Sequence, residues 1–432
     1  MEKQIRINIV DSDQNLLIIN PNTILDIKSL EYSLCFGIKE IKIMVSTTLN
    51  MKVNEIQLSR AVIDYLNIPT SSQFEYNLVD NQLIIGPFIG ILATRKRKKL
   101  KKKLMNINNY VKYYDKIGGA VIAFSLEGIN KNNYTVEGYY YNPQKNDWEF
   151  GIYPYPGAII KTIKISQYWK DHFQTVLKNK VFNLNTFNKW EMHQWLSNDS
   201  KIKDHLPETL LYQTPSDLID FLDKHLHAYI KPINGSFGKK IVKVSKTTEG
   251  YLIYYRKKLK RYELTLEDFQ RSLSKGKYII QKPLDISVNN RIVDFRHIIV
   301  KNELGEWEDM GCIGRRGPVG STITNQNSYI NMGYPMLTTV LSFKKEEALY
   351  LSEKMSQLAL QSAESIENHS PFCGIYGNFG IDLAIDKDKR IWLIEINNRN
   401  PRHTMATLAR QPDVYYETLL SLMQFAKRLS LN

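Results

Sequence analysis

Residues 377–401 read GNFGIDLAIDKDKRIWLIEINNRNP, and this stretch near the end of the chain decides the fold. Apolar residues alternate with polar or small ones between positions 381 and 385, which predicts a strand with one apolar face. The charged segment 386–390 predicts a tight turn, and the apolar run 391–396 predicts a second strand. The stretch therefore predicts a β-hairpin.

Three polar side chains of this hairpin, Asp382, Glu395 and Asn397, carry hard oxygen donors. Glu395 and Asn397 are two residues apart in one strand, so both point to the same face of the pleat. We expect the apolar residues of that strand, Ile394 among them, to face the core. Oxygen donors on a rigid hairpin suit Mg²⁺, which usually also takes phosphate oxygens. A solvated hairpin whose acids face water is the alternative.

Length and composition are those of an ordinary globular protein. The chain has 432 residues, of which 43% are hydrophobic and 24% charged, and this length predicts roughly two to four domains. No apolar run reaches the ~20 residues of a membrane span, and the first residues lack the apolar segment of a secretory signal. The three cysteines lack metal-ligand spacing and cannot form a disulfide framework. We therefore expect a cytoplasmic protein without a transmembrane segment.

The positive charge of the chain is concentrated in one run. The formal net charge is +14, and residues 95–103, RKRKKLKKK, hold eight basic residues in nine. We interpret the run as a solvated linker or helix start between domains. Weak contact with nucleic acid or an anionic surface is the alternative. No aromatic residue interrupts the run, so it offers no stacking platform for single-stranded bases.

The pattern of strands and turns predicts four segments. Residues 1–94 are rich in short strands, with one helix at 59–66, and predict a β-rich N-terminal domain that forms a small barrel or sheet. Residues 95–105 are the basic linker. Residues 106–180 alternate between helix and strand and predict a small α/β domain. Residues 181–432 carry the chemical signals.

The stretch 182–196 predicts a turn, capped by Thr or Asn, that enters a helix with Lys189 in its first turn. A cation at that position is opposed by the helix dipole, so it is a poor choice for stability alone. A second amphipathic helix is expected at 216–225. His225 and His227 at its end are interpreted as surface residues rather than metal ligands.

A strand lysine and a glycine-containing loop come next. Lys231 lies at the end of an expected strand, and the loop that follows contains Gly235, Ser236 and Gly238. Glycine lets backbone N–H groups approach a phosphate without obstruction by a Cβ atom, and lysine adds the counter-charge. This combination suits phosphate binding in a cleft. A simple hairpin that carries two glycines is the alternative.

Two further strands are expected at 277–284 and 292–300. In the second, Asp294 and Arg296 are two residues apart and point to one face. They form either a simple salt bridge or a divided site, with the aspartate on a ribose hydroxyl and the arginine on a phosphate. Arg315 adds another guanidinium group, and a long amphipathic helix then leads into the closing hairpin.

The order of these features resembles the ATP-grasp superfamily. A helix-start lysine, a strand lysine with a glycine loop, an Asp-Phe-Arg strand and a Glu-Ile-Asn strand follow one another along the chain. More closely, the chain resembles the YheC/YheD-like ATP-grasp family, described as associated with endospore coats. The matching pieces are 86–90, 118–119, 136–139, 154–156, 182–183, 189–190, 230–232, 238, 280–281, 294–296 and 392–397.

This resemblance implies an α+β ATP-grasp fold, in which two α+β subdomains hold ATP between them after an α/β pre-ATP-grasp layer. The implied nucleotide-binding residues are Lys189 and Lys231 at the phosphates, Gly235, Ser236 and Gly238 in the covering loop, Gln281, Lys282 and Leu284 at the adenine, and Asp294 at the ribose.

The resemblance also implies a reaction. Arg296, Arg315 and Asn325 would face the γ-phosphate and an acyl phosphate, and the three hairpin oxygen donors would hold one or two Mg²⁺ ions. ATP would activate a carboxylate to an acyl phosphate, which an amine or thiol would attack with release of ADP and phosphate. Such phosphoryl transfer needs positioned cations around a metal-bridged triphosphate rather than a side-chain nucleophile.

The substrates remain open. Two positions on the acceptor side differ from the family pattern: Gly333 stands alone where the family often has a pair, and the strand at 158–161 lacks polar asparagine-arginine character. Three functions are therefore considered. The first is an ATP- and Mg²⁺-dependent ligase acting on a peptide or small molecule. The others are a non-catalytic nucleotide-binding protein of the spore coat and a kinase that phosphorylates a hydroxyl.

Overall fold

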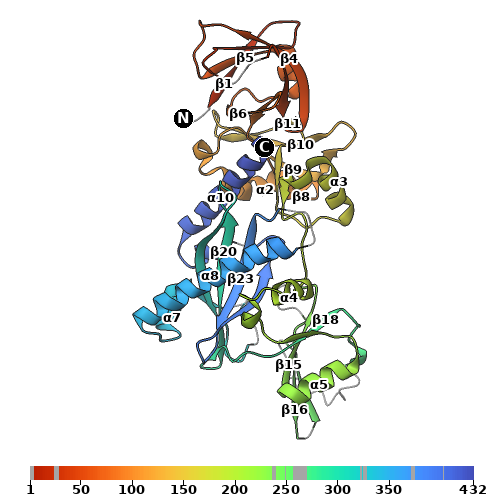
Figure 1. The fold of residues 1–432 in the computed structure, drawn as a ribbon, viewed down its shortest axis with the longest axis vertical. Helices are drawn as coiled ribbons and strands as arrows, with labels where there is room; N and C mark the ends of the chain where they lie inside the picture. Colours follow the sequence, from red (N-terminus) through yellow and green to blue (C-terminus); the bar gives the residue numbers. More distant parts are fainter. Residues whose placement is uncertain are drawn as a thin grey trace.

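The computed structural model describes residues 4–23, 29–235, 240–248, 250–255, 270–321, 324, 328–370, 375–401 and 403–432. It is an elongated stack of four sheets (Figure 1), with the N-terminal barrel at one end and the smallest sheet at the other. None of the described helices has the length and apolar character that crossing a bilayer requires.

Among the described residues, the N-terminal part is a closed barrel of seven strands. Its strands, in spatial order, are β1 (Ile5–Val10), β5 (Glu55–Ser59), β2 (Leu16–Ile19), β4 (Lys39–Thr47), β3 (Glu31–Phe36), β7 (Gln82–Gly86) and β6 (Gln73–Val79). Helix α1 (Arg60–Leu66) starts directly after β5 and ends at Asn67, which adopts the left-handed conformation that stops a helix.

The second sheet lies directly below the barrel. Its spatial order is β11 (Asp147–Pro154), β10 (Thr135–Asn142), β9 (Ala120–Asn130), β8 (Phe88–Thr94), β12 (Ala158–Lys161) and β13 (Val181–Phe182). The sequence placed residues 88–94 in the first segment, but β8 is buried along its whole length in this second sheet. Its continuous apolar run fits a strand covered on both faces, and the barrel ends at Gly86.

The basic run is helical, which agrees with the helix-start form of its interpretation. It forms η1 (Arg97–Lys99) and the start of α2 (Leu100–Ile107), and Leu100 is buried against the second sheet. The short 3₁₀ helices η2 (Asn108–Val111) and η3 (Tyr114–Lys116) follow α2. Helix α3 (Gln167–Leu177) and turn η4 (Lys178–Lys180) complete this part.

The third sheet and its helices form the outer end of the molecule. The sheet order is β14 (Thr209–Leu211), β18 (Tyr278–Gln281), β15 (His227–Pro232), β16 (Val242–Thr247) and β17 (Gly250–Tyr255). Helix α5 (Pro215–His225) packs its apolar face on this sheet, and α4 (Lys189–Ser197) and η5 (Lys203–His205) precede it in the chain.

The fourth sheet contains the closing hairpin. Its order is β22 (Tyr329–Met332), β21 (Trp307–Arg316), β20 (Arg291–Lys301), β23 (Asn378–Ile385) and β24 (Ile391–Asn397), and β19 (Ser287–Val288) pairs with β20. Helices α7 (Gly333–Thr339) and α8 (Lys345–His369) cover one face of it. The predicted hairpin is therefore present as β23 and β24.

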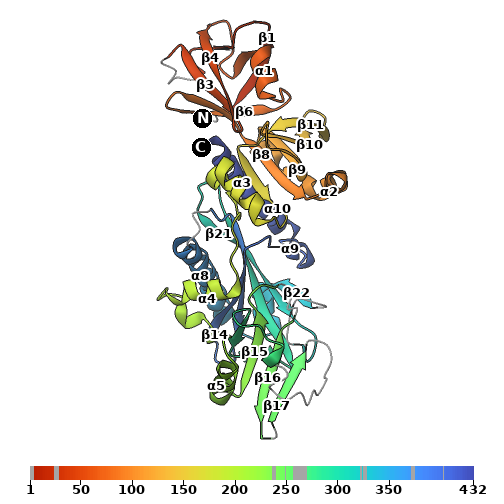
Figure 2. The same cartoon turned by 90° about the vertical axis from the view of Figure 1, so that its right-hand side faces the viewer.

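The C-terminal helix joins these parts. After α9 (Met405–Leu408), α10 (Pro412–Leu431) packs against β8 and β12 of the second sheet and β20 of the fourth, as Figure 2 shows from the side. At its end, the carbonyl of Leu431 accepts a hydrogen bond of 2.9 Å from Asn77 Nδ2 of the barrel. One hydrophobic core therefore connects the second and fourth sheets.

Candidate functional site

Two adjoining cavities lie between the third and fourth sheets. The smaller has a volume of about 120 Å³ and the larger about 900 Å³, and Lys189, Asp382 and Glu395 line both. Every candidate residue that the structure describes lines at least one of them. Lys231, Gln281, Lys282, Leu284 and Asp294 line the smaller cavity, and Gly235, Arg296, Arg315 and Asn397 line the larger. Ser236, Gly238 and Asn325 lie outside the described residues.

Lys189 is held at the start of α4 by a capping box. The side chain of Asn188 accepts hydrogen bonds from the backbone of Trp190 and Glu191, and Glu191 Oε2 accepts one of 2.7 Å from the backbone of Asn188. Lys189 Nζ then lies 2.9 Å from Glu395 Oε1 and 3.1 Å from the Gly235 carbonyl. Glu395 offsets the unfavourable position of this cation at a helix start.

Lys231 reaches into the smaller cavity from β15. Its Nζ donates to Gln281 Oε1, while Gln281 Nε2 donates to Thr209 Oγ1 over 3.0 Å. The pKa of Lys231 is lowered to about 8, mainly by burial; Glu395 opposes this shift and Lys189 contributes to it. A phosphate placed beside Lys189 and Lys231 would therefore meet two adjacent cations and one carboxylate.

Most of the other residues around the smaller cavity are apolar, although His193 and Thr324 also line it. It is lined by Tyr229, Ile241, Ile279, Leu284, Ile286, Ile292 and Ile394. The sequence placed Ile394 in the core, and this prediction is wrong. A β-bulge follows the pair Asp382–Glu395, because the next pair is Leu383–Leu393 and Ile394 is left without a partner. The extra residue turns Ile394 toward the cavity while its neighbour Glu395 still reaches the polar side.

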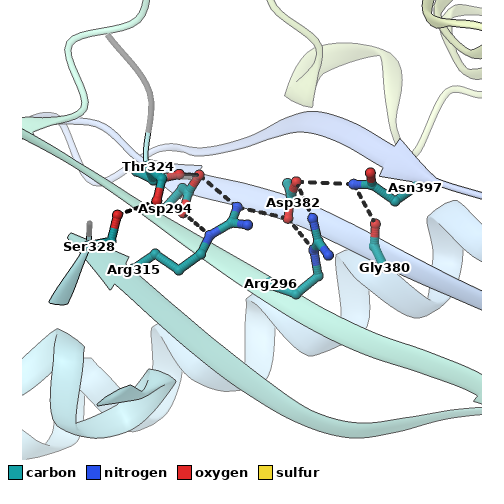
Figure 3. Close-up of polar contacts among 8 residues, drawn as sticks. All are labelled: Asp294, Arg296, Arg315, Thr324, Ser328, Gly380, Asp382 and Asn397. Atoms are coloured by element: carbon teal, nitrogen blue, oxygen red, sulfur yellow. Dashed lines mark hydrogen bonds and ion pairs between the residues drawn. The ribbon is translucent and has the colours of Figure 1, made fainter. Parts of the chain in front are cut away.

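Four buried charged side chains form a continuous chain across three strands (Figure 3). Arg315 Nε and Nη2 lie 2.6 and 2.8 Å from the two oxygens of Asp294, and Arg315 Nη2 also lies 3.0 Å from Asp382 Oδ1. Arg296 donates to both oxygens of Asp382, over 2.8 Å to Oδ2. Asp294 and Arg296 are thus not paired with each other, although they are two residues apart.

The cross-strand register explains this pairing. Asp294 lies opposite Arg315 in β21, and Arg296 lies opposite Asp382 in β23. Burial would raise the pKa of Asp382, but the guanidinium groups of Arg296 and Arg315 outweigh it and hold that pKa below its ordinary value. Two carboxylates and two guanidinium groups balance in charge, so the chain can stay ionised in the sheet.

The three proposed metal ligands lie together at the end of the hairpin. Asp382 is paired with Glu395 in the strand register, and Asn397 Nδ2 donates to Asp382 Oδ2 over 3.2 Å. Asn397 Oδ1 and Glu395 Oε2 accept no hydrogen bond from the described residues, whereas both Asp382 oxygens are occupied by arginines. These two available oxygens, one from the amide of Asn397 and one from the carboxylate of Glu395, lie beside the carboxylate of Asp382 and fit Mg²⁺, which takes its remaining ligands from phosphates and water.

Two supporting residues were not assigned a role from the sequence. Thr324 donates from Oγ1 to Asp294 Oδ2. Asn183, in the left-handed conformation at φ 53°, donates from Nδ2 to the carbonyls of Asn378 and Asn398 over 2.8 and 2.7 Å. It thereby ties the two open ends of the hairpin together. The signal was present, since Asn183 belongs to one of the motifs that carry the family resemblance.

This arrangement, two α+β units with a lysine-lined cleft between them, is that of an ATP-grasp protein. A sequence model described as "YheC/D like ATP-grasp" matches residues 178–429. The chain belongs to this YheC/D-like ATP-grasp family, and the predicted family and α+β ATP-grasp fold are both confirmed.

Two curated relatives come from Bacillus subtilis (strain 168). The endospore coat-associated protein YheD is 26% identical over 421 residues, which cover 89% of this chain and 90% of YheD. The endospore coat-associated protein YheC is 25% identical over 249 residues, which cover 55% of this chain and 66% of YheC.

Solved structures with a similar course of the chain have low sequence identity. The ATP-grasp ligase PsnB complexed with a minimal precursor is 11% identical, with a TM-score of 0.44, and the match covers 78% of this chain and 99% of PsnB. The VanG D-Ala:D-Ser ligase from Enterococcus faecalis is 10% identical, with a TM-score of 0.46, and the match covers 78% of this chain and 98% of VanG.

Proposed function

We propose that this protein is an ATP- and Mg²⁺-dependent ligase that joins a carboxylate to an amine or thiol. The observation that carries the proposal is the meeting of two cavities at Lys189, Asp382 and Glu395. One cavity combines an apolar slot with two lysines, which suits a nucleotide. The other is larger and carries several charged and amide side chains, which suits the substrates. The family membership supports the nucleotide assignment.

Each part of the smaller cavity has a proposed role toward ATP. The apolar residues around Leu284 and Ile292 hold the base, and the segment from Gln281 to Leu284 contacts its edge through the backbone. Lys189 and Lys231 bind phosphate oxygens, because both can turn from their present carboxylate and amide partners to a more highly charged acceptor. Asp294 borders the same cavity and is assigned to the ribose.

The metal would be held by Glu395 and Asn397, with Asp382 beside them. When bound, Mg²⁺ neutralises phosphate charge and orients the triphosphate. Glu395 would exchange Lys189 for the metal, which frees the lysine for a phosphate. Arg296 and Arg315 stay in the sheet and present their remaining N–H groups to the larger cavity, where negative charge develops during transfer.

The proposed chemistry has two steps. A substrate carboxylate oxygen attacks the γ-phosphorus of ATP, the bond to the β-phosphate oxygen breaks, and an acyl phosphate and ADP result. An amine nitrogen then attacks the acyl carbon and loses a proton as inorganic phosphate leaves. With a thiol, sulfur takes the place of nitrogen. The chain supplies cations and positioning, and no side-chain nucleophile is needed.

The test is substrate-dependent release of ADP and phosphate by the full chain. The double variant Glu395→Gln with Asn397→Ala should lose turnover while keeping its fold by circular dichroism. The matched control is Glu364→Gln with Asn368→Ala on the exposed side of α8. Undiminished turnover in the Glu395/Asn397 variant would refute the assignment. A phosphorylated product without free phosphate would identify a kinase instead.

A second candidate function rests on the occupancy of Asp382. Because Arg296 and Arg315 engage both of its oxygens, the site is also consistent with a nucleotide-binding protein that does not catalyse. The names of YheD and YheC support a location in or near a spore coat for such a protein. Tight ATP binding without phosphate release across a broad set of acceptors, together with recovery in a spore-coat fraction, would favour this second function.

A further inference from the structure

Three cations lie near one another where the end of β12 adjoins the segment after β24, and one of them, Arg399, also lines the larger cavity. Lys161 ends β12, Lys170 lies in α3, and Arg399 follows β24, so three separate segments contribute one positive charge each. Arg399 and its neighbour Asn400 line the larger cavity. Asn400 Nδ2 donates to the carbonyl of Thr162 over 2.7 Å, which ties the residue after Lys161 to the cavity wall.

Lys161 is an unusual residue for a strand end in the core. It is only 6% exposed, and within the described part of the chain no acceptor forms a hydrogen bond or ion pair with its Nζ. A buried ammonium group is costly unless an anion or acceptor compensates it. Burial, together with the nearby charges of Lys170 and Arg399, lowers the pKa of Lys161 to about 8.

The other two cations do not compensate the buried positive charge of Lys161. Burial lowers the pKa of Lys170, Arg399 lowers it further, and the acids Asp171 and Glu191 oppose the shift only in part. Arg399 is exposed to the cavity and forms no ion pair with any described residue. Three positive charges from separate segments therefore repel one another, and this arrangement is unfavourable for stability alone.

We propose that Lys161, Lys170 and Arg399 form a binding site for an anionic group, a carboxylate or phosphate, of the second substrate. Arginine can bind either group through two parallel N–H donors, and two ammonium groups add charge without fixing the shape of the ligand. This inference rests on the proposed function only in its reference to a second substrate. It adds that the substrate is acidic and is bound partly by the second sheet.

The site predicts a specific effect of small anions on stability. Inorganic phosphate or malonate should raise the thermal unfolding midpoint of the full chain above the value in chloride at equal ionic strength, since a ligand that binds only the folded state stabilises it. The apparent affinity should fall about tenfold or more in Lys161→Met and in Arg399→Gln, because each change removes a charge-assisted contact. Lys201→Gln, an exposed lysine shortly after α4, is the control and should behave as the unchanged protein.

Two features keep the test decisive. Arg399 is exposed, so Arg399→Gln should fold even if Lys161→Met does not. A rise in the unfolding midpoint with phosphate but not with malonate would indicate a phosphorylated substrate. A rise with malonate would indicate a substrate that carries a carboxylate. No rise in the unchanged protein, or an equal rise in both variants, would overturn the proposal.

A non-hydrolysable ATP analogue with Mg²⁺ separates this inference from the proposed function. If the analogue binds and abolishes the response to phosphate, the anion occupies the nucleotide site and the inference is wrong. If the response depends on Lys161 and Arg399 while the analogue fails to bind, the inference stands and the proposed function fails. If phosphate raises the unfolding midpoint further when the analogue is already bound, both the inference and the proposed function are supported.

Discussion

Lys189 Nζ lies 2.9 Å from Glu395 Oε1, which joins the first turn of α4 to the last strand of the closing hairpin. The two residues are 206 positions apart in the chain, yet they form the shared wall of both cavities. A cation placed against its helix dipole is thus offset by a carboxylate that is itself a proposed metal ligand. A nucleotide with Mg²⁺ can separate this pair, because the metal can bind Glu395 and a phosphate can bind Lys189.

Replacing Lys189 should weaken nucleotide binding more than it weakens the fold. We expect Lys189→Met to lower the affinity for a non-hydrolysable ATP analogue about tenfold or more, because one phosphate loses a charge-assisted contact. Isothermal titration calorimetry measures this change. Lys201→Met, an exposed lysine shortly after α4, is the control. An unchanged affinity in Lys189→Met would contradict the phosphate role.

The affinity for ATP should depend on pH through Lys231, whose pKa is lowered to about 8 by burial. Phosphate favours the charged lysine, so binding raises this pKa. The affinity should therefore be nearly constant below pH 7 and fall above pH 8, by up to about tenfold per pH unit, as the free protein loses the proton. Lys231→Met should bind more weakly and lose this decline. An identical pH profile in the variant would assign the effect to another group.

The buried chain of charges predicts a large cost for removing one acid. Asp382→Asn leaves Arg296 and Arg315 without their shared carboxylate, and we expect a loss of about 3 to 5 kcal/mol in the free energy of unfolding. Denaturant titration measures it, with Asp388→Asn in the exposed turn of the same hairpin as the control. A loss below about 1 kcal/mol would show that the chain contributes little to stability.

The same carboxylate makes an acid-sensitive contribution. Because the pKa of Asp382 is lower in the folded than in the unfolded chain, its stabilisation is complete above the ordinary value of 3.8. It is then lost as the pH falls through the lowered value. Asp382→Asn should therefore remove part of the pH dependence of stability below about pH 4. Parallel denaturation curves for the two proteins in acid would contradict this.

Lys161 predicts a gain in stability with the opposite pH dependence. Its pKa is about 8 in the folded chain against an ordinary 10.5, so the cost of burying the charge is full below pH 8 and disappears between pH 8 and 10.5. In anion-free buffer, Lys161→Met should raise the free energy of unfolding by about 3 kcal/mol at pH 7, and by much less at pH 10. A gain that does not change with pH would point to packing rather than charge.

The alternative interpretation of the basic run, weak contact with a nucleic acid, can be tested separately. Arg97 is held 2.7 Å from Glu137, but Lys98, Lys99, Lys101, Lys102 and Lys103 are exposed. If they contact a nucleic acid, replacing the five lysines with Gln should reduce the affinity and flatten its salt dependence. Filter binding at several salt concentrations measures both quantities. An affinity independent of salt, or unchanged in the variant, would exclude this contact.

The hairpin shows which features the local sequence pattern can predict and which it cannot. Alternation of apolar and polar residues predicted both strands and placed Glu395 and Asn397 on one face, because side-chain direction follows directly from strand geometry. It failed at Ile394, because a bulge changes the alternation without any marker in the strand itself. The prediction for β8 failed in another way. Its apolar run correctly indicated a buried strand, but such a run does not indicate which sheet the strand joins.

The sequence by itself determined the family, the α+β fold and the residue types that line the cleft, because these follow from local periodicity and from motifs read in order. Only the tertiary structure decided the partners of the charged residues. Asp294 and Arg296 suggested a pair by spacing, yet Asp294 pairs with Arg315, 21 positions away, and Arg296 with Asp382, 86 positions away. The physical reason is that neighbours in a strand point along one face at a fixed spacing, whereas charge pairing depends on which strand lies alongside. The grouping of Lys161 with Lys170 and Arg399 arose in the same way, from three segments brought together by packing.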